Sequence, residues 1–290
     1  MTNELFLNLL SKFKPSNVIE IKNAMKEVLQ SIILTGISKS DFFKKAVFYG
    51  GTSLRLLRGL PRYSEDLDFT LTLNDEKFEL SNYFKYIDNE LRSYGFIYEY
   101  NNKNKEIITS VDSVYFKFNL KYLFEISYND YINQITPNEV LSIKVEVEKN
   151  GINGGGTEYK LLTYPSFVRV RTFTMDTMFA SKIIAVLNRK WKNRIKGRDF
   201  YDYLFYISLH TKVNLTFLEN GLKKFGYLEE NDKLTLERLK IELKERFETI
   251  DFSNALLDVK PFVSSGDIFI DSFNKDIFIS TIDMIFISEE

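Results

Sequence analysis

The segment at residues 47–71, VFYGGTSLRLLRGLPRYSEDLDFTL, constrains the fold of this chain most strongly. Its apolar start, at residues 46–49, predicts a strand, and Gly50 and Gly51 predict a tight turn. Residues 54–58 have helical spacing, and an extended acidic run closes the segment. The sequence therefore predicts a strand–turn–helix–strand unit.

Two carboxylates lie in the second strand of this unit. Because side chains alternate between the faces of a strand, Asp66 and Asp68 should point the same way, while Leu67 and Phe69 point into a core. Neighbouring carboxylates repel each other unless a cation or hydrogen-bond donors compensate their charge. A divalent metal is the simplest compensation, and Mg²⁺ with its phosphate ligands suits such a pair. A solvated strand end is the alternative interpretation.

The glycine turn predicts a phosphate site. Gly50 and Gly51 let backbone N–H groups approach a ligand, and Thr52 or Ser53 would cap the helix that follows. A helix N-terminus attracts anions, so phosphate would bind there beside the metal. An ordinary strand-to-helix turn is the alternative, but the combination with the acidic strand favours a functional site. Neither GxxxxGK[ST] nor GxGxxG is present.

Composition is typical of a globular protein and excludes several chemistries. The 290 residues are 44% hydrophobic, which suffices for one large or two moderate domains. The net charge of −1 gives no general attraction to nucleic acid or membrane. Without cysteine there is no thiol catalysis, and the single histidine, His210, disfavours histidine chemistry. With no basic leader and no apolar run near about 18 residues, we expect a cytoplasmic protein that does not enter a membrane.

The hydrophobic period changes from two residues to helical spacing near residue 170. We therefore expect two domains, at residues 1–170 and 171–290. In the first, a strand predicted at residues 141–149 carries Glu146 in the middle of its polar face. We expect Glu146 to be a third metal-binding carboxylate; a solvent-facing edge strand is the alternative.

Two predicted helices, at residues 175–192 and 198–209, carry further candidates. Lys182 lies in the first helix, and Asp199 and Asp202 lie one turn apart in the second. A surface lysine with its charge in water and an acid favoured by the helix dipole are the alternatives. A basic group around the junction could contact RNA through phosphates and stacking, or be a solvated helix end. It consists of Arg189, Lys190, Trp191, Lys192, Arg194, Lys196 and Arg198.

Three stretches carry a family resemblance. They are GGTSLR followed by RYSEDLDF, the acidic strand KVEVE, and KIIAVLNR followed by GRDFYD. Over about residues 45–210 the chain resembles the AbiEii/AbiGii nucleotidyltransferase-like family, the toxins of type IV toxin–antitoxin systems, and within it a member from the Helicobacter pylori plasticity region. The resemblance implies an α+β fold, with a polymerase-β-like nucleotidyltransferase domain of mixed sheet followed by a helical-bundle domain.

The resemblance also implies roles for single residues. Asp66, Asp68, Lys182 and Asp199 would be catalytic, with Asp202 competing for the role of Asp199. Two Mg²⁺ ions would be bound by Asp66, Asp68 and Glu146. The nucleotide-binding residues would be Gly50, Gly51, Thr52, Ser64 and Lys182.

Together these features predict a Mg²⁺-dependent nucleotidyltransferase that uses an NTP and modifies RNA, with tRNA as the favoured acceptor. It would act as a bacterial toxin with a cognate antitoxin. In-line attack on the α-phosphorus develops charge that metal ions between carboxylates neutralise. Lys182 would pair with the triphosphate, and Asp199 would orient that lysine or the acceptor hydroxyl. Transfer to a protein or small molecule, and a catalytically degenerate protein that binds nucleotide or a partner, are open alternatives.

Overall fold

Two compact units make up the computed structural model, which describes residues 2–102, 110–190, 195–264 and 266–288. The first, the sheet unit, comprises Met1–Gly59, Tyr63–Gly151 and Tyr159–Thr172. The second, the helical unit, comprises Leu60–Arg62, Ile152–Glu158 and Phe173–Glu290. Because the units are interleaved along the chain, a single domain boundary at residue 170 stays a prediction.

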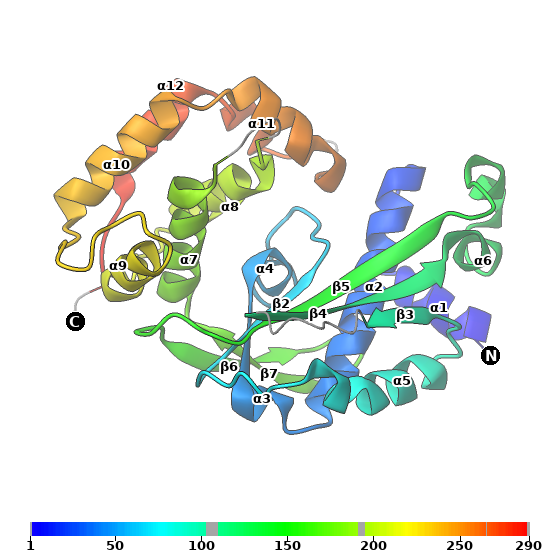
Figure 1. Ribbon diagram of the computed structural model, residues 1–290. Coiled ribbons are helices and arrows are strands. Elements are labelled where there is room, and N and C mark those ends of the chain that lie inside the picture. The colour runs from blue at the N-terminus through cyan, green and yellow to red at the C-terminus, as the bar shows by residue number, and fades with distance from the viewer. Residues whose placement is uncertain (1, 103–109, 191–194, 265, 289–290) are drawn as a thin grey trace. The chain divides into compact units, whose positions relative to one another are not determined.

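The described residues of the sheet unit form a mixed seven-stranded sheet with the order β3-β4-β5-β2-β1-β7-β6 (Figure 1). β1 pairs antiparallel with β2 and parallel with β7, and β2 pairs parallel with β5. β4 pairs antiparallel with both β3 and β5. The strands are β1 Ala46–Tyr49, β2 Leu67–Leu71, β3 Glu99–Asn102, β4 Val111–Asn119, β5 Val140–Glu148, β6 Thr157–Leu162 and β7 Val168–Phe173.

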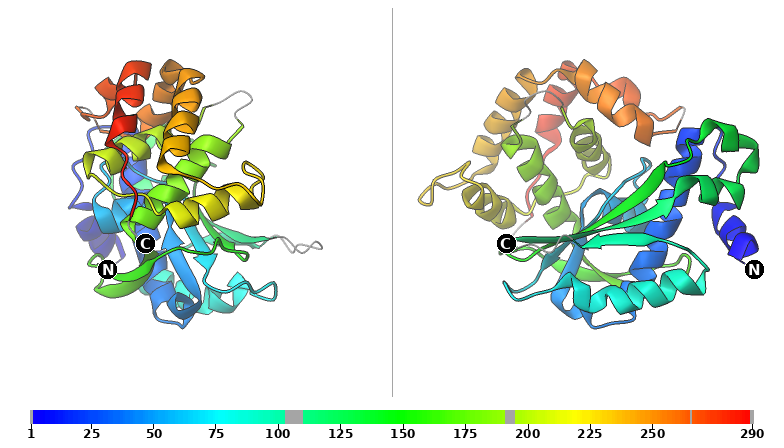
Figure 2. Two further views of the ribbon diagram at one scale, coloured as in Figure 1. Left: turned by 90° about the vertical axis from the view of Figure 1, so that its left-hand side faces the viewer. Right: turned by 45° about the vertical axis from the view of Figure 1, so that its right-hand side comes forward.

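The strand predicted at residues 141–149 is confirmed as β5, displaced by one residue. Its buried and half-buried residues alternate as the polar pattern predicts. β5 and β4, with nine residues each, lie side by side in every view (Figures 1 and 2). They bring the polar face with Glu146 beside β2.

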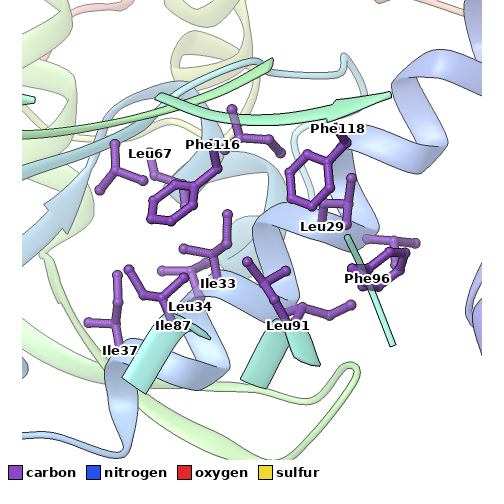
Figure 3. Packing of buried hydrophobic residues seen from close by; sticks show 14 of the residues in the cluster. Leu29, Ile33, Leu34, Ile37, Leu67, Ile87, Leu91, Phe96, Phe116 and Phe118 are labelled. Carbon is purple, nitrogen blue, oxygen red and sulfur yellow. The ribbon is translucent and has the colours of Figure 1, made fainter. Parts of the chain in front are cut away.

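Two helices bury their apolar side chains against one face of this sheet. The helices of the sheet unit are α1 Thr2–Leu10, α2 Val18–Ser38, α3 Phe42–Lys45, α4 Gly50–Arg58, α5 Phe84–Ser93 and α6 Leu120–Glu125. α2 begins where Asn17 caps it, with its side chain accepting from the Glu20 N–H. Figure 3 shows α2 and α5 contributing to one apolar cluster with β2 and β4. Its labelled members are Leu29, Ile33, Leu34, Ile37, Leu67, Ile87, Leu91, Phe96, Phe116 and Phe118.

The helical unit packs around aromatic side chains. Its helices are α7 Met175–Asn188, α8 Gly197–Ser208, α9 Leu215–Lys224, α10 Leu236–Glu248, α11 Phe252–Val259 and α12 Lys275–Ser280. Phe252 and Phe278 stack with ring centroids 4.4 Å apart, and Phe200 meets both edge-on. α10 and α12 lie side by side (Figures 1 and 2). Phe179 on α7 stacks with Tyr206 on α8, with ring centroids 4.8 Å apart, so aromatic packing also fixes the two helices that carry Lys182 and Asp199.

The helix predicted at residues 175–192 is confirmed as α7, which ends at Asn188. The helix predicted at residues 198–209 is α8, displaced by one residue. Among the helices of the described ranges, none combines the length and apolar character that crossing a membrane requires.

Candidate active site

The predicted strand–turn–helix–strand unit is confirmed as β1, α4 and β2. α4 begins at Gly50 rather than near residue 54. Gly50 has a φ of +77°, in the left-handed region that favours glycine. A Cβ at Gly50 would lie 2.7 Å from Oδ2 of Asp68. The turn therefore brings its backbone directly against the carboxylate of β2.

The prediction that Thr52 or Ser53 caps α4 is wrong. Tyr49 is the N-cap residue, and both hydroxyl residues lie inside the first turn, completely buried. The Thr52 hydroxyl donates to the carbonyl of Asp66, and the Ser53 hydroxyl lies 2.8 Å from that of Thr172. Because the first N–H groups of a helix lack intrahelical partners, the backbone of α4 is better suited than the Thr52 hydroxyl to bind an anion.

Asp66 and Asp68 are held by the backbone in different ways. Asp68 lies within β2, where it is paired with Tyr49 on β1 and with Glu146 on β5. Asp66 precedes the first residue of β2. Both residues are half-buried, while Leu67 and Phe69 are buried in the core, as the alternation predicts.

The third candidate carboxylate, Glu146, stands beside Asp68 on the same face of the sheet, because paired residues of adjacent strands share a face. Oε1 of Glu146 lies 2.6 Å from Nζ of Lys144. Burial would lower the pKa of Lys144, but this ion pair and the nearby charge of Asp66 raise it. Lys144 thus counters the negative charge of the carboxylate group.

The donor set fits a magnesium ion. In the described ranges, no three His, Cys, Asp or Glu side chains gather closely enough to form a metal cage. Mg²⁺, however, is usually held by one or two carboxylates with waters and substrate phosphates, and seldom by an all-protein cage. Asp68 and Glu146, paired across β2 and β5, are two such carboxylates. The backbone of Gly50, at the N-terminus of α4, lies against Asp68.

Lys182 joins two acids in a buried network within the helical unit. Its Nζ lies 2.8 Å from Oδ1 of Asp199 and 2.8 Å from Oδ2 of Asp202. The two aspartate side chains are 1% and 0% exposed, and that of Lys182 is 13% exposed. The interpretation of Lys182 as a lysine with its charge in water is therefore wrong.

Arg62 extends this network and was given no role by sequence reasoning. Its Nε and Nη2 donate to the two carboxylate oxygens of Asp202 at 2.6 and 2.7 Å. Both side chains are almost completely buried, and the paired geometry is the strongest that a guanidinium and a carboxylate make. The sequence did contain a signal, because Arg62 opens the RYSEDLDF motif.

Asp199 is surrounded by positive charge. Burial would raise its pKa, but Lys182, Arg189 and Lys196 outweigh burial and lower the pKa to about 2. Arg189 donates to the second oxygen of Asp199. For Asp202, burial is likewise outweighed by Arg62 and Lys182, which lower its pKa. Both acids are therefore ionised at neutral pH.

The basic group at the α7–α8 junction is partly engaged inside the protein. Arg189 pairs with Asp199, and the guanidinium of Arg198 lies 4.1 Å from the ring centre of Phe262. Burial and the neighbouring Arg189 lower the pKa of Lys196. Lys190 is exposed. The remaining members of the group, Trp191, Lys192 and Arg194, lie outside the described residues.

Comparisons with known proteins place this architecture in a family. A family model described as "Nucleotidyl transferase AbiEii toxin, Type IV TA system" matches residues 32–274. A solved structure of JHP933 from Helicobacter pylori has 17% identity and a TM-score of 0.54, with 90% of each chain covered. MenT4, a nucleotidyltransferase toxin from Mycobacterium tuberculosis, has 14% identity and a TM-score of 0.59, with 98% of this chain and 89% of that chain covered.

At these identities the two structures show a shared fold, which confirms the predicted α+β fold with mixed sheet and following helices. No curated protein matches the sequence. The family match, which covers most of the chain, decides the assignment. The chain is a nucleotidyltransferase of the AbiEii toxin family of type IV toxin–antitoxin systems.

Proposed function

We propose that this toxin transfers a nucleotidyl group from an NTP to an RNA acceptor, with tRNA favoured, in a Mg²⁺-dependent reaction. One observation carries the proposal: the sheet register sets Asp68 opposite Glu146, while the turn at Gly50 brings the start of α4 against Asp68. Carboxylates for a metal and backbone donors for phosphate thus lie side by side, and nucleotidyl transfer requires both.

The proposed chemistry is an in-line displacement. The acceptor hydroxyl oxygen attacks the α-phosphorus of the NTP, the bond to the bridging oxygen of the β-phosphate breaks, and pyrophosphate leaves. Asp66, Asp68 and Glu146 would hold Mg²⁺ as two ions, which would supply neutralisation of the negative charge that develops during the displacement. The backbone at Gly50 and Gly51 binds phosphate.

Lys182 and Asp199 complete the proposed set. Lys182 pairs with the triphosphate as a positive charge, and Asp199 holds the lysine in place. Asp202 is the less suitable catalytic acid, because its partner Arg62 is almost completely buried, whereas Arg189, which binds Asp199, is 40% exposed. This distinction supports Asp199 over Asp202 for the catalytic role.

The acceptor class rests on the family and on the basic group near Lys190. Incubating the protein with labelled NTPs together with total RNA and total protein separates the alternatives. Label in the RNA pool supports the proposal, and label in protein supports transfer to protein. Nucleotide binding without any transfer would indicate a degenerate enzyme. By family we also propose a cytoplasmic protein with a cognate antitoxin.

Substitution of Asp66 and Asp68 tests the catalytic assignment. Asp66→Ala and Asp68→Ala should each abolish nucleotidyl transfer and growth arrest while circular dichroism stays unchanged, because the carboxylates act on the substrate. Glu148→Gln is the matched control: Glu148 lies two residues beyond Glu146 on the same strand face, and its replacement should leave transfer intact. Undiminished transfer and toxicity in both aspartate variants would remove the assignment.

A further inference from the structure

Three consecutive carbonyl groups just before β2 are held by side chains from two helices of the sheet unit. The Gln30 amide on α2 donates to the carbonyl of Ser64 at 3.1 Å and to that of Glu65 at 2.7 Å. The Thr52 hydroxyl on α4 donates to the carbonyl of Asp66. The backbone from Ser64 to Asp66 is therefore clamped at every residue.

Gln30 is an unusual residue for its place in the helix. It is 1% exposed, and its neighbours Val28, Leu29 and Ile32 are all buried apolar residues of the core. Burying an amide costs free energy unless its donors find partners, and here both N–H groups do so outside the helix. The amide's particular contribution is therefore to hold the segment before β2.

Asp66 needs such support more than Asp68 does. The ladder pairs of β2 begin at Leu67, so the sheet itself fixes Asp68 but not the residue before the strand. A misplaced ligand weakens metal binding, and groups that orient ligands typically contribute tenfold or more to metal affinity or activity. The hydrogen bonds from Gln30 and Thr52 to the carbonyls of residues 64–66, here called the clamp, act on the main chain that carries the proposed metal ligand Asp66.

A neighbouring contact on α2 strengthens the same attachment. Lys26, one turn before Gln30, pairs with Oε1 of Glu65 at 3.1 Å. Its side chain is 18% exposed and that of Glu65 is 34% exposed, so water screens this pair more than the amide bonds. Gln30 should therefore contribute more than Lys26.

We infer that Gln30 is a positioning residue: together with Thr52 it fixes the backbone from Ser64 to Asp66 and so aims the Asp66 carboxylate at the metal. The inference rests on the proposed function, because it concerns the metal that Asp66 would bind. Gln30 itself would touch neither metal nor nucleotide, and it acts through the main chain of residues 64–66.

Gln30→Met tests the inference, because methionine keeps the length of the side chain and removes both donors. We expect amide hydrogen exchange in residues 64–67 to become at least about tenfold faster, with β4 and β5 unchanged. The Mg²⁺ concentration for half-maximal transfer should rise about tenfold or more. Excess Mg²⁺ should restore the rate, and the KM for NTP should change little. General loss of structure would produce neither the rescue nor the local exchange pattern.

Ser31→Ala is the matched control. Ser31 is the next residue of α2 and equally buried, but its hydroxyl donates to the Glu27 carbonyl within the helix. In Ser31→Ala, hydrogen exchange at residues 64–67 and the metal requirement for transfer should match those of the wild type. Should Gln30→Met not fold, Thr52→Val removes the other half of the clamp without changing side-chain shape, and it should produce the same two shifts.

Asp66→Asn separates failure of the inference from failure of the proposed function. If Asp66→Asn abolishes metal-dependent transfer while Gln30→Met and Thr52→Val behave as wild type, the clamp has no positioning role. If Asp66→Asn transfers nucleotide with the wild-type metal requirement, the proposed metal site itself is wrong. Loss of transfer in Asp66→Asn, together with a raised metal requirement in Gln30→Met, supports both.

Discussion

Gly50 combines a left-handed backbone conformation with a close approach to the Asp68 carboxylate. Its positive φ makes any other residue strained, and its Cβ position lies 2.7 Å from Oδ2 of Asp68. Gly59, the C-terminal neighbour of α4, has nearly the same φ, +76°, but nothing lies within 4 Å of its Cβ position. The two glycines therefore separate backbone strain from displacement of the carboxylate.

Gly50→Ala and Gly59→Ala should each lower the free energy of unfolding by about 1–2 kcal/mol, the cost of the left-handed conformation. Only Gly50→Ala should also reduce nucleotidyl transfer strongly, because its methyl group pushes against Asp68. Denaturant unfolding and transfer rates of both variants check this. Equal activity of the two variants would show that the close approach has no functional importance.

Replacement of the two buried aspartates of α8 should lower the free energy of unfolding by different amounts. Asp202→Asn removes the carboxylate charge that pairs with the Arg62 guanidinium, which is only 3% exposed, and this should cost about 3–5 kcal/mol. Asp199→Asn should cost less, about 1–3 kcal/mol, because the Arg189 side chain is 40% exposed and can turn to water.

Transfer measured well below the unfolding temperature should show the opposite order. Asp199→Asn should lose most of its activity while folded, and Asp202→Asn should lose activity chiefly through unfolding. Equal stability losses, or full activity of folded Asp199→Asn, would contradict the division of roles between a catalytic and a structural aspartate.

At the scale of elements, the ion-pair network between α7 and α8 predicts how stability depends on pH. The pKa of Asp199 is lowered from 3.8 to about 2, so the folded state binds its proton less readily than the unfolded chain. Its stabilising contribution is complete above about pH 5 and is lost as the pH falls towards about 2. At about 1.4 kcal/mol for each pH unit, the loss is about 2 kcal/mol.

Denaturant unfolding of the wild type and Asp199→Asn between pH 2 and pH 6 measures this contribution. The difference in unfolding free energy should be constant above about pH 5 and should shrink by about 2 kcal/mol towards pH 2. A difference that grows on acidification would have the wrong sign for an acid whose pKa is lowered in the folded state.

The elements that bear the site were predictable because their signals are local. The apolar run, paired glycines and alternating acids predicted β1, α4 and β2, and alternation predicted β5. The start of α4 was placed too late because Thr52 and Ser53 resemble helix caps, whereas their hydroxyls bond to Asp66 and Thr172. Such partners are distant in the sequence, and no local pattern reveals them.

The same reason explains the residues that sequence reasoning missed. Gln30 binds carbonyls 34 and 35 residues away, and Arg62 binds an aspartate 140 residues away. In the sequence, Gln30 is only a polar residue inside an apolar helix, and Arg62 is only a motif arginine. Their importance follows from burial and hydrogen bonding, which arise when the helices pack.

For the whole molecule, the change of hydrophobic period near residue 170 predicted a sheet-rich half and a helical half. It did not predict that residues 60–62 and 152–158 belong to the helical unit. The ion pair between Arg62 and Asp202 attaches the first of these segments to α8. Arg62 lies four residues before the proposed metal ligand Asp66 in the sequence. A long-range ion pair of this kind has no signature in the hydrophobic period.

The most direct test of the account is to follow the two ends of the triphosphate. Purified protein is incubated with Mg²⁺, total RNA and NTPs labelled either at the α-phosphate or at the γ-phosphate, with Asp68→Ala in parallel. Nucleotidyl transfer with release of pyrophosphate predicts that α-label enters RNA, that γ-label does not, and that Asp68→Ala transfers neither. Entry of γ-label into RNA, or undiminished α-label transfer by Asp68→Ala, would contradict the account.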